Sequence, residues 1–354
     1  MKRLFLLLFT LLITITSTTQ AQTIWMVFYT DNGLAFINTI TGENVTLPLT
    51  GERFTIVNNS VIYFDNQHGR VMIAYPDGRQ VDHPFIQPAA ESRRIDWVIS
   101  DDEAWIAWTL TSTDTQGRLT TRTSIAEING SNQRVIFTET DNTNSNLRAL
   151  PVAFSADNQT LYMDSHPDGI GQFTPFSQYV GMFAVDLATG AKTLLPGEEG
   201  SSCICGGTIE QDLFLRLRLH LTTDSTGFDL YIYDLIGNVE TVIPTIRLTN
   251  YNTSGDVLLS PDGKQIIYTL ARIQNFGTAN QSLQTVFVLL DLVTNEQSRL
   301  NDTALTSLMR PIGWTENNTA IMLIDTLERE TWKLNIETGD LQHITDGIYI
   351  GILQ

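Results

Sequence analysis

The feature that most constrains the fold of this chain is a short turn motif that recurs along it. One copy is "LSPDGKQIIY" at Leu259–Tyr268, where a Ser is followed two residues later by an Asp and an apolar residue comes four positions further on. Ser and Asp side chains bond nearby backbone, Pro fixes φ and Gly supplies a positive φ, so the motif predicts a tight turn between two strands. The copies are Ser100, Asp102 and Ile106; Ser155, Asp157 and Leu161; Ser260, Asp262 and Ile266; Thr315, Asn317 and Ile321.

The spacing of the motif predicts a repeat architecture. The Ser/Thr positions are 55, 105 and 55 residues apart, so the wide gap should hold a degenerate copy, expected within Cys203–Leu213. A second signature, an apolar strand that ends in Asp or Asn before a Gly- or Asn-containing turn, predicts a hairpin. It occurs near Ile37, Tyr75, Ile128, Asp186, Asp234, Asp291 and Asn335. Four-stranded units repeated every 40 to 60 residues or so are what a β-propeller requires.

We therefore predict an all-β chain that forms one propeller domain over residues 22–354, with seven blades, and with six or eight as the alternatives. The first blade has no innermost strand before Ile24, whereas the chain ends in an unassigned apolar run. We expect Ile348–Leu353 to supply that strand and close the ring, which would remove the exposed sheet edges. The expected blades are Thr23–Leu49, Arg53–Phe85, Arg94–Glu139, Leu147–Pro196, Ser202–Pro244, Asn250–Leu300 and Met309–Thr345.

The first 21 residues are predicted to be a signal peptide. Lys2 and Arg3 precede an apolar run from Leu4 to about Thr16, and Thr19-Gln20-Ala21 fits a cleavage site. An uncleaved anchor is the alternative, but the run is shorter than the roughly 18 to 20 apolar residues of a spanning helix. We expect export to the periplasm or the extracellular space.

Charge narrows the choice of partners. Without the leader, 19 basic residues face 39 acidic ones, a net charge of −20. Such a surface repels phosphate backbones and anionic lipid, so no nucleic-acid partner is expected. We expect a monomer that spans no membrane after cleavage.

Two pairs of segments carry a resemblance to a known family. "LSPDGKQIIYTL" with "VFVLLDLVTNEQSRL", and "FSADNQTLYMDS" with "FAVDLATGAKTLL", resemble the blades of TolB-like, WD-repeat-like bacterial propellers. The resemblance covers Arg94–Thr345 and implies the fold rather than an activity. TolB proteins have a preceding α/β domain and six blades, and both differences argue against a role in the Tol envelope machinery.

Motifs of catalysis and cofactor binding are missing. We find no Gly-x-Ser-x-Gly, no Gly-rich phosphate loop and no His-Glu-x-x-His, and the five histidines lie singly. We therefore expect no cofactor and no metal. Cys203 and Cys205, two residues apart, could form a local disulfide, stay as buried thiols, or serve a redox or metal site.

The meander geometry predicts where a ligand would bind. The two signatures are short turns on one face of the disc, so the long loops belong to the other, hereafter the long-loop face. The expected long loops there are Thr111–Leu119, Ser165–Gln178 and Arg272–Leu283. Candidate ligand-binding residues are Arg93, Arg148, Arg310, His166, Phe173, Phe176, Arg272 and Phe276.

Arg93, Arg148 and Arg310 stand five to seven residues before their turn residues, at the starts of innermost strands. Three converging guanidiniums would hold a carboxylate or an acidic sugar. In the alternative arrangement, each arginine pairs with a nearby acid such as Glu91 or Asp96 and serves the scaffold.

Two functions of different classes follow. The first is an exported, non-catalytic binding or interaction module for a protein, a glycan or a small anionic ligand. The second is a propeller enzyme that acts on polysaccharide, a lyase or glycosidase, which would need a compact acid/base cluster at the channel mouth.

Overall fold

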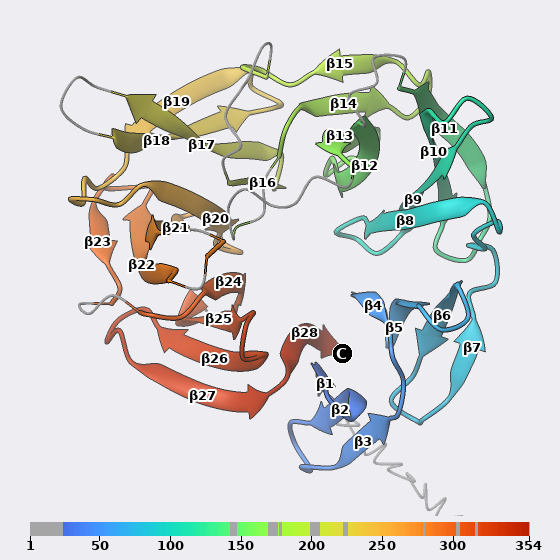
Figure 1. The fold of residues 1–354 in the computed structure, drawn as a ribbon, viewed down its shortest axis with the longest axis horizontal. Coiled ribbons are helices and arrows are strands. Elements are labelled where there is room, and N and C mark those ends of the chain that lie inside the picture. The colour runs from blue at the N-terminus through green and yellow to red at the C-terminus, as the bar shows by residue number, and fades with distance from the viewer. Residues whose placement is uncertain are drawn as a thin grey trace, which may run out of the picture.

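The protein is a seven-bladed β-propeller (Figure 1). The computed structural model describes residues 24–141, 147–168, 176, 179–198, 206–221, 226–275, 277–278, 280–301, 305–315 and 318–353. The described residues form 28 strands and no α-helix, and the strands make seven antiparallel four-stranded sheets. The predicted fold class and blade count are therefore confirmed.

Strands run from the channel outward in every blade, and the blades match the expected ones within a few residues. Blades 1 to 3 contain β28 (Ile348–Leu353), β1 (Trp25–Thr30), β2 (Gly33–Asn38) and β3 (Asn44–Leu47); β4 (Glu52–Val57), β5 (Ser60–Asp65), β6 (Arg70–Ala74) and β7 (Gln80–Asp82); β8 (Ser92–Ile99), β9 (Trp105–Thr113), β10 (Leu119–Glu127) and β11 (Arg134–Thr140). Blades 4 and 5 contain β12 (Leu147–Phe154), β13 (Thr160–Pro167), β14 (Met182–Asp186) and β15 (Lys192–Leu194); β16 (Gly207–Glu210), β17 (Leu213–Leu221), β18 (Thr226–Asp234) and β19 (Val239–Pro244). Blades 6 and 7 contain β20 (Thr253–Leu259), β21 (Gln265–Gln274), β22 (Ser282–Asp291) and β23 (Gln297–Arg299); β24 (Met309–Trp314), β25 (Ala320–Asp325), β26 (Glu330–Asn335) and β27 (Leu341–Asp346).

The first turn signature joins the first and second strands of its blades. In blade 3, Ser100 Oγ donates to Asp102 Oδ1 at 2.6 Å and accepts the Trp105 N–H at 2.9 Å. The same bonds recur at Ser155 and Ser260. Asn317 of the last copy lies outside the described residues.

Blade 5 holds the degenerate copy. Its first turn consists of Gln211 and Asp212, whose φ values of 51° and 57° are both left-handed. Two left-handed residues close a two-residue hairpin without a longer polar loop. The Ser-x-Asp motif is therefore absent from this blade although the strand pairing is the same.

The second signature forms the turn between the third and fourth strands. Asp186 Oδ1, for example, accepts the backbone N–H groups of Ala188 and Thr189 at 3.1 and 2.7 Å. Asp234, Asp291 and Asn335 accept two N–H groups in the same way. The hairpins predicted from these positions are confirmed.

The apolar core lies between the blades. One cluster joins Leu215 and Leu230 of blade 5 to Ile266 and Val288 of blade 6. Equivalent clusters join blades 1 and 2, 2 and 3, 3 and 4, 4 and 5, and 6 and 7. Sheets packed face to face in this way bury the alternate side chains of both partners.

Ring closure follows the prediction. β28 is antiparallel to β1, with Leu353 opposite Trp25 and Ile348 opposite Tyr29. The buried hydroxyl of Thr331 in blade 7 donates to the Gly347 carbonyl at 2.6 Å and accepts the Tyr349 N–H at 3.0 Å. The first blade is therefore built from both ends of the described chain.

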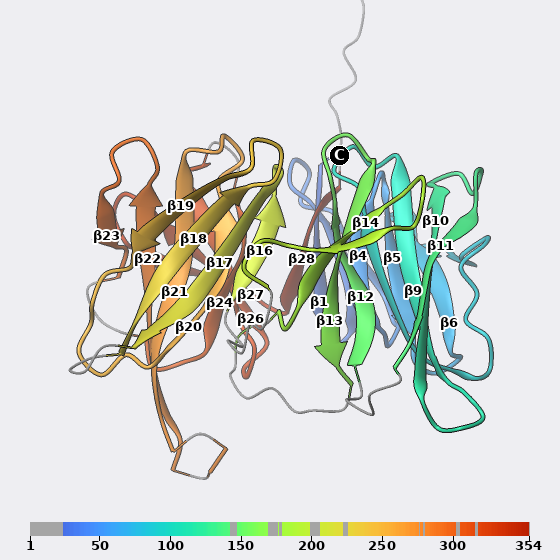
Figure 2. The ribbon, with the colours of Figure 1, turned by 90° about the horizontal axis from the view of Figure 1, so that it is seen from above.

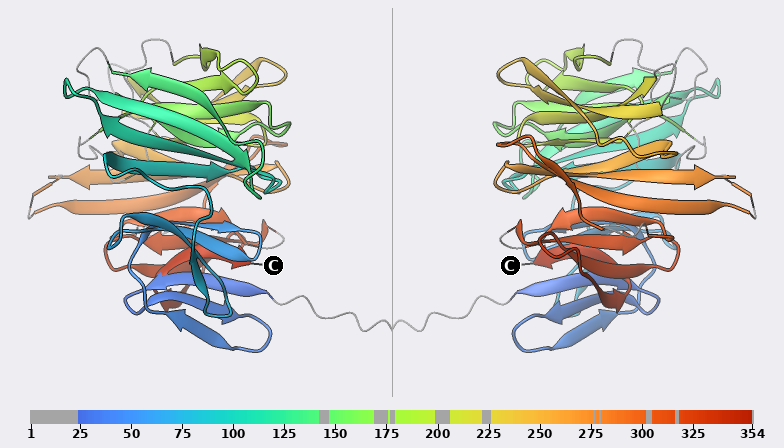
Figure 3. Two further views of the ribbon diagram at one scale, coloured as in Figure 1. Left: turned by 90° about the vertical axis from the view of Figure 1, so that its right-hand side faces the viewer. Right: turned by 90° about the vertical axis from the view of Figure 1, so that its left-hand side faces the viewer.

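The long-loop face carries the projecting hairpins. Figures 2 and 3 show β21 and β22 extending beyond the disc on the side opposite the C-terminus. The loop expected over Arg272–Leu283 is shorter than predicted, because β21 continues to Gln274 and β22 begins at Ser282. Ala271 and Ile273 stay buried there against Phe176 and Leu308, which keeps the hairpin extended.

The predicted signal peptide lies outside the described residues. In the part of the chain that the structure describes, no helix is long and apolar enough to cross a membrane.

Truncating Leu353 to Ala should measure the contribution of the closing strand. Leu353 is 1% exposed in the cluster between blades 1 and 2, so the substitution should lower the free energy of unfolding by about 2 to 4 kcal/mol. Leu194→Ala is the matched control, since Leu194 is 47% exposed and should change stability by less than about 0.5 kcal/mol. Equal effects of both substitutions in urea unfolding would contradict the role assigned to β28.

Candidate functional site

A cavity of about 580 Å³ lies on the long-loop face between blades 6 and 7. This volume is within the range of small-ligand sites. Its walls come from the β21–β22 hairpin, from the segment between β23 and β24, and from the turn after β25. The lining residues are Arg272, Gln274, Gln281, Ser282, Leu283, Gln284, Thr306, Leu308 and Leu327.

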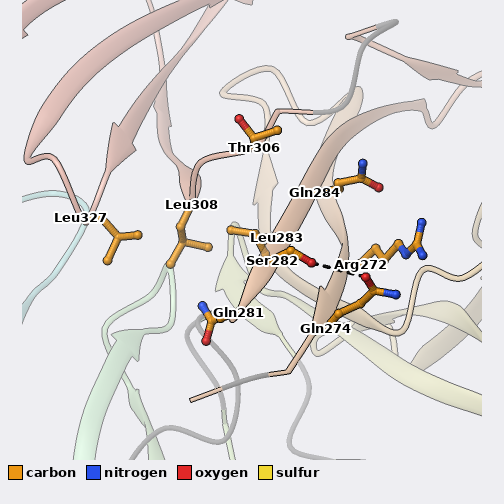
Figure 4. A pocket seen from close by; sticks show the side chains of 9 residues that line it. All are labelled: Arg272, Gln274, Gln281, Ser282, Leu283, Gln284, Thr306, Leu308 and Leu327. Atoms are coloured by element: carbon orange, nitrogen blue, oxygen red, sulfur yellow. Dashed lines mark hydrogen bonds between the residues drawn. The ribbon is translucent and has the colours of Figure 1, made fainter. Parts of the chain in front are cut away.

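The cavity, hereafter the Arg272 pocket, has an apolar side and a polar side. Figure 4 shows Leu283, Leu308 and Leu327 on one side and Arg272, Gln274 and Gln284 on the other. Leu327 is 71% exposed, which leaves an aliphatic surface available at the rim. One cation among neutral amides, hydroxyls and leucines suits a ligand with a single negative group.

Arg272 is the predicted site residue that the structure places in this pocket. Its Nε is buried, and among the described residues no hydrogen bond or ion pair engages the guanidinium. Burying an unpaired cation costs free energy, which a ligand carboxylate would recover. Arg272 therefore differs from the other predicted arginines.

Arg93 and Arg148 meet in a second group of charges, at the starts of the inner strands of blades 2 to 4. Arg148 is 3% exposed and pairs with Asp96 of β8, and its Nε lies 3.6 Å from Asp168. Arg93 lies 3.3 Å from the same Asp168, through Nη2. Burial lowers the pKa of Arg148, whereas Asp96 raises it.

Arg53 and Arg94 complete this group, and the sequence did not single them out. Arg53 of β4 forms an ion pair with Asp96, and Arg94 Nε lies 3.8 Å from it. The group thus links the inner strands of three neighbouring blades. This is the scaffold arrangement, in which each arginine pairs with an acid.

Arg310 lies in a different pair. Its Nε and Nη2 donate to Asp256 of β20 at 2.9 and 2.6 Å. A bidentate pair of this kind joins blades 6 and 7. Anion binding by Arg93, Arg148 and Arg310 together stays a prediction, and the structure divides them between two sets of carboxylates.

β-Bulges orient the side chains of Arg53 and Asp256 toward their ion-pair partners. Both sit in β-bulges of inner strands with left-handed φ values of 60° and 46°. A bulge redirects a side chain from its normal alternation, at a cost in backbone strain. The pattern of apolar residues gives no signal for these bulges, which is why both residues were missed.

The other predicted site residues have varied surroundings. Phe176 is fully buried, so it contributes packing rather than a ligand contact. His166 stands opposite Arg148 in the β12–β13 pair, and its Nδ1 lies 3.2 Å from Asp164. Phe173, Phe276, Cys203 and Cys205 lie outside the described residues.

The basic residues of β17 ("LFLRLRLHL"), which are Arg216, Arg218 and His220, each lie near an acid. Arg216 is 1% exposed and its Nε lies 3.4 Å from the buried Glu198 Oε1. Arg218 lies 3.8 Å from the same oxygen, and His220 contacts Asp229 at 2.6 Å. The two arginine pairs hold β17 against the connection from blade 4, whereas the His220–Asp229 pair joins β17 to β18 within blade 5.

The opposite face of the disc, hereafter the short-turn face, is acidic around the channel. The first turns of blades 3 to 6 carry Asp101, Asp102, Glu103, Asp157, Asp212 and Asp262 against one lysine, Lys264. Burial, then Asp212 and Asp102, raise the pKa of Asp101. Acids at the inner-strand starts of the long-loop face, by contrast, are paired with arginines. The two ends of the channel thus differ in charge.

Glu210 is a partly buried carboxyl of the short-turn face. It ends β16, and its Oε2 accepts the Leu259 N–H of blade 6 at 3.1 Å. Burial raises the pKa of Glu210 to about 7, against hydrogen bonds from Thr208 and Leu259 that lower it.

One group of side chains has the composition of a metal site. Among the described residues, ligand atoms of Glu330, His343 and Asp346 lie within 4.8 Å of one another on the outer strands of blade 7. His343 and Asp346 are exposed, and Glu330 accepts a hydrogen bond from Trp332 Nε1 at 3.0 Å. Nothing else at this position points to an ion.

Comparisons with known proteins identify no family for this chain. No protein-family model matches the sequence, and no curated protein matches it significantly. Similar solved structures include hydrazine synthase of Kuenenia stuttgartiensis, 13% identical over 84% of this chain and 80% of that one, with a TM-score of 0.49. A putative TolB of Agrobacterium tumefaciens is 12% identical over 80% and 91% of the chains, with a TM-score of 0.42. AztD of Citrobacter koseri is 12% identical over 93% and 96%, with a TM-score of 0.42.

Replacing Glu210 with Gln should change how stability depends on pH. The folded pKa is raised to about 7 from an ordinary value of 4.5, so the folded protein holds the proton more tightly than the unfolded chain. The tighter proton binding adds to the free energy of unfolding. This added stability is fully present below about pH 4.5, falls as the pH rises to about 7 and is absent above that pH. Gln keeps an acceptor for the Leu259 N–H. The free energy of unfolding of the variant minus that of the wild type should therefore be larger at pH 8 than at pH 4, by on the order of 2 kcal/mol. If the difference in free energy of unfolding between the variant and the wild type were the same at pH 4 and at pH 8, the assignment would be refuted.

Proposed function

We propose that the protein is an exported binding module without catalytic activity, which holds the anionic group of a ligand in the Arg272 pocket. The observation that carries the proposal is the partly buried guanidinium of Arg272, unpaired among the described residues, in the wall of a cavity. A carboxylate that enters would gain charge-assisted hydrogen bonds in a site partly shielded from water. The leader expected at residues 1–21 supports export.

The charge distribution supports binding on this face. In a chain with net charge −18 including the leader, an anion is repelled by most of the surface. The acids of the short-turn face strengthen this repulsion, whereas the inner-strand arginines of the long-loop face reduce it. An anionic ligand would therefore approach from the long-loop side.

The alternative, a lyase or glycosidase, receives less support from the geometry. Such an enzyme needs two carboxyl groups or an acid/base pair beside the substrate. The lining of the Arg272 pocket contains no carboxyl group and no histidine among the described residues. Glu210, the carboxyl whose pKa rises to about 7, lies on the short-turn face.

Arg272→Gln should weaken the binding of simple carboxylates. We expect calorimetric titration with N-acetylglutamate and with glucuronate to show binding of at least one of them to the wild type. The variant should lose at least tenfold in affinity, since a charged hydrogen bond contributes about 1.5 to 3 kcal/mol.

Arg79→Gln is the matched control. Arg79 is exposed on the short-turn face, where it pairs with Asp77 and covers Tyr75. Its replacement removes the same charge and should leave the affinity unchanged. Equal losses in both variants would mean that only the net charge matters, and failure of both ligands to bind the wild type would refute the proposal.

A further inference from the structure

The Arg272 pocket lies along an edge of β22 that has no strand partner among the described residues. The outermost strand β23 pairs with only three residues of β22, from Val288 to Leu290. Nearer the hairpin tip, a single bridge joins Thr285 to Leu305. Closer to the hairpin tip than this bridge, no described residue pairs with the outer edge of β22, and the pocket lies beside Leu283, with Thr306 and Leu308 also in its lining.

The backbone of Leu283 points into this opening. Thr285 exchanges two hydrogen bonds with Leu305, at 2.8 and 2.9 Å, so the N–H and C=O of Thr285 point outward. Groups two residues apart on a strand point the same way, which gives Leu283 the same direction.

The neighbouring strand confirms this direction independently. Ile273 stands opposite Leu283 in the β21–β22 pair. Its N–H and C=O are bonded to the Asn252 side chain, on the far side of β21, at 3.0 and 2.9 Å. Ile273 and Leu283 are therefore a non-hydrogen-bonded pair, and the Leu283 N–H and C=O face away from β21 into the pocket.

Side chains on either side of this edge differ in chemistry. Leu283 projects to the face of the hairpin where Ile273 and Leu308 pack. Gln284 and Ser282 project to the other face, where their cross-strand partners are Arg272 and Gln274. A strand added beside β22 would place one side chain on the leucine face and its two neighbours on the Arg272 face.

We propose that the edge of β22 at Leu283 binds an extended peptide by strand addition, with an apolar residue opposite Leu283 and acidic residues on both sides of it. The proposal rests on the proposed function and names its ligand class. Main-chain bonds to Leu283 would supply affinity, and the two faces would supply selectivity for alternating acidic and apolar residues. Charge complementarity to Arg272 selects acidic over basic side chains.

The test uses end-capped hexapeptides and fluorescence anisotropy. A labelled peptide that alternates Glu and Val should bind the full-length protein, and the peptide that alternates Lys and Val should bind at least tenfold more weakly. Methylation of the backbone nitrogen at a central Val should also weaken binding about tenfold, because it removes a donor and blocks close pairing. Arg272→Gln should reduce the preference for Glu over Lys.

Two substitutions at one position isolate the main-chain bond. Leu283→Ala removes the leucine side chain but keeps the backbone N–H, whereas Leu283→Pro removes the leucine side chain and the N–H. Proline is tolerated where the N–H of an edge strand is outside the ladder, so both variants should have similar melting temperatures. The proline variant should bind the Glu-Val peptide about tenfold more weakly than the alanine variant.

The outcomes separate this inference from the proposed function. If carboxylates bind through Arg272 but the peptides do not, or if backbone methylation has no effect, strand addition is overturned and the anion pocket stands. If Leu283→Pro and Leu283→Ala bind the peptide equally, the role of the Leu283 N–H is refuted. If the Glu-Val and Lys-Val peptides bind equally, the acidic pattern is wrong.

Discussion

The pairing of β28 with β1 is the interaction on which the rest of the structure depends. Seven sheets packed side by side leave two free ends, and these must meet to bury the last seam. Here the final strand completes the first blade, so the described chain closes the ring by backbone pairing in one sheet. The Thr331 hydroxyl bonds Gly347 and Tyr349, where the chain passes from β27 of blade 7 to β28 of blade 1. These bonds fix the position of that connection. The remaining seams can then be held by apolar packing between blades.

Charged side chains at the channel add specificity to that packing. Asp96 joins three blades through Arg53, Arg94 and Arg148, and Asp256 joins two through Arg310. Buried pairs of this kind contribute little net stability compared with apolar residues, but removing one partner leaves a costly unpaired charge. They therefore favour one register between neighbouring blades. The left-handed residues Arg53 and Asp256 show that the backbone is bent to make these contacts.

The same ring geometry divides the surface into two faces with different turns and charges. On the acidic face, burial raises the pKa of Glu210 to about 7. Blade 6 is different because β21 and β22 each have ten residues while β23 has three. The unequal lengths expose backbone of β22, the third strand of the blade, next to Arg272, which has no partner among the described residues. The pocket is thus a consequence of strand length rather than of a special loop.

The sequence by itself determined the fold, because turns and strand alternation are local properties. Ser100 and Asp102 bond their own backbone, so the motif predicts the turn wherever it occurs. The count of seven blades and the closing strand followed from such repeats. Arg272 was also named as a candidate, within a segment expected to be a loop. Only the tertiary structure decided what each candidate contacts: it buried Phe176, paired Arg148 and Arg310 with acids of other blades, and left Arg272 unpaired among the described residues. Partners such as Arg148 and Asp96 are 52 residues apart, and no local pattern encodes a contact made between blades.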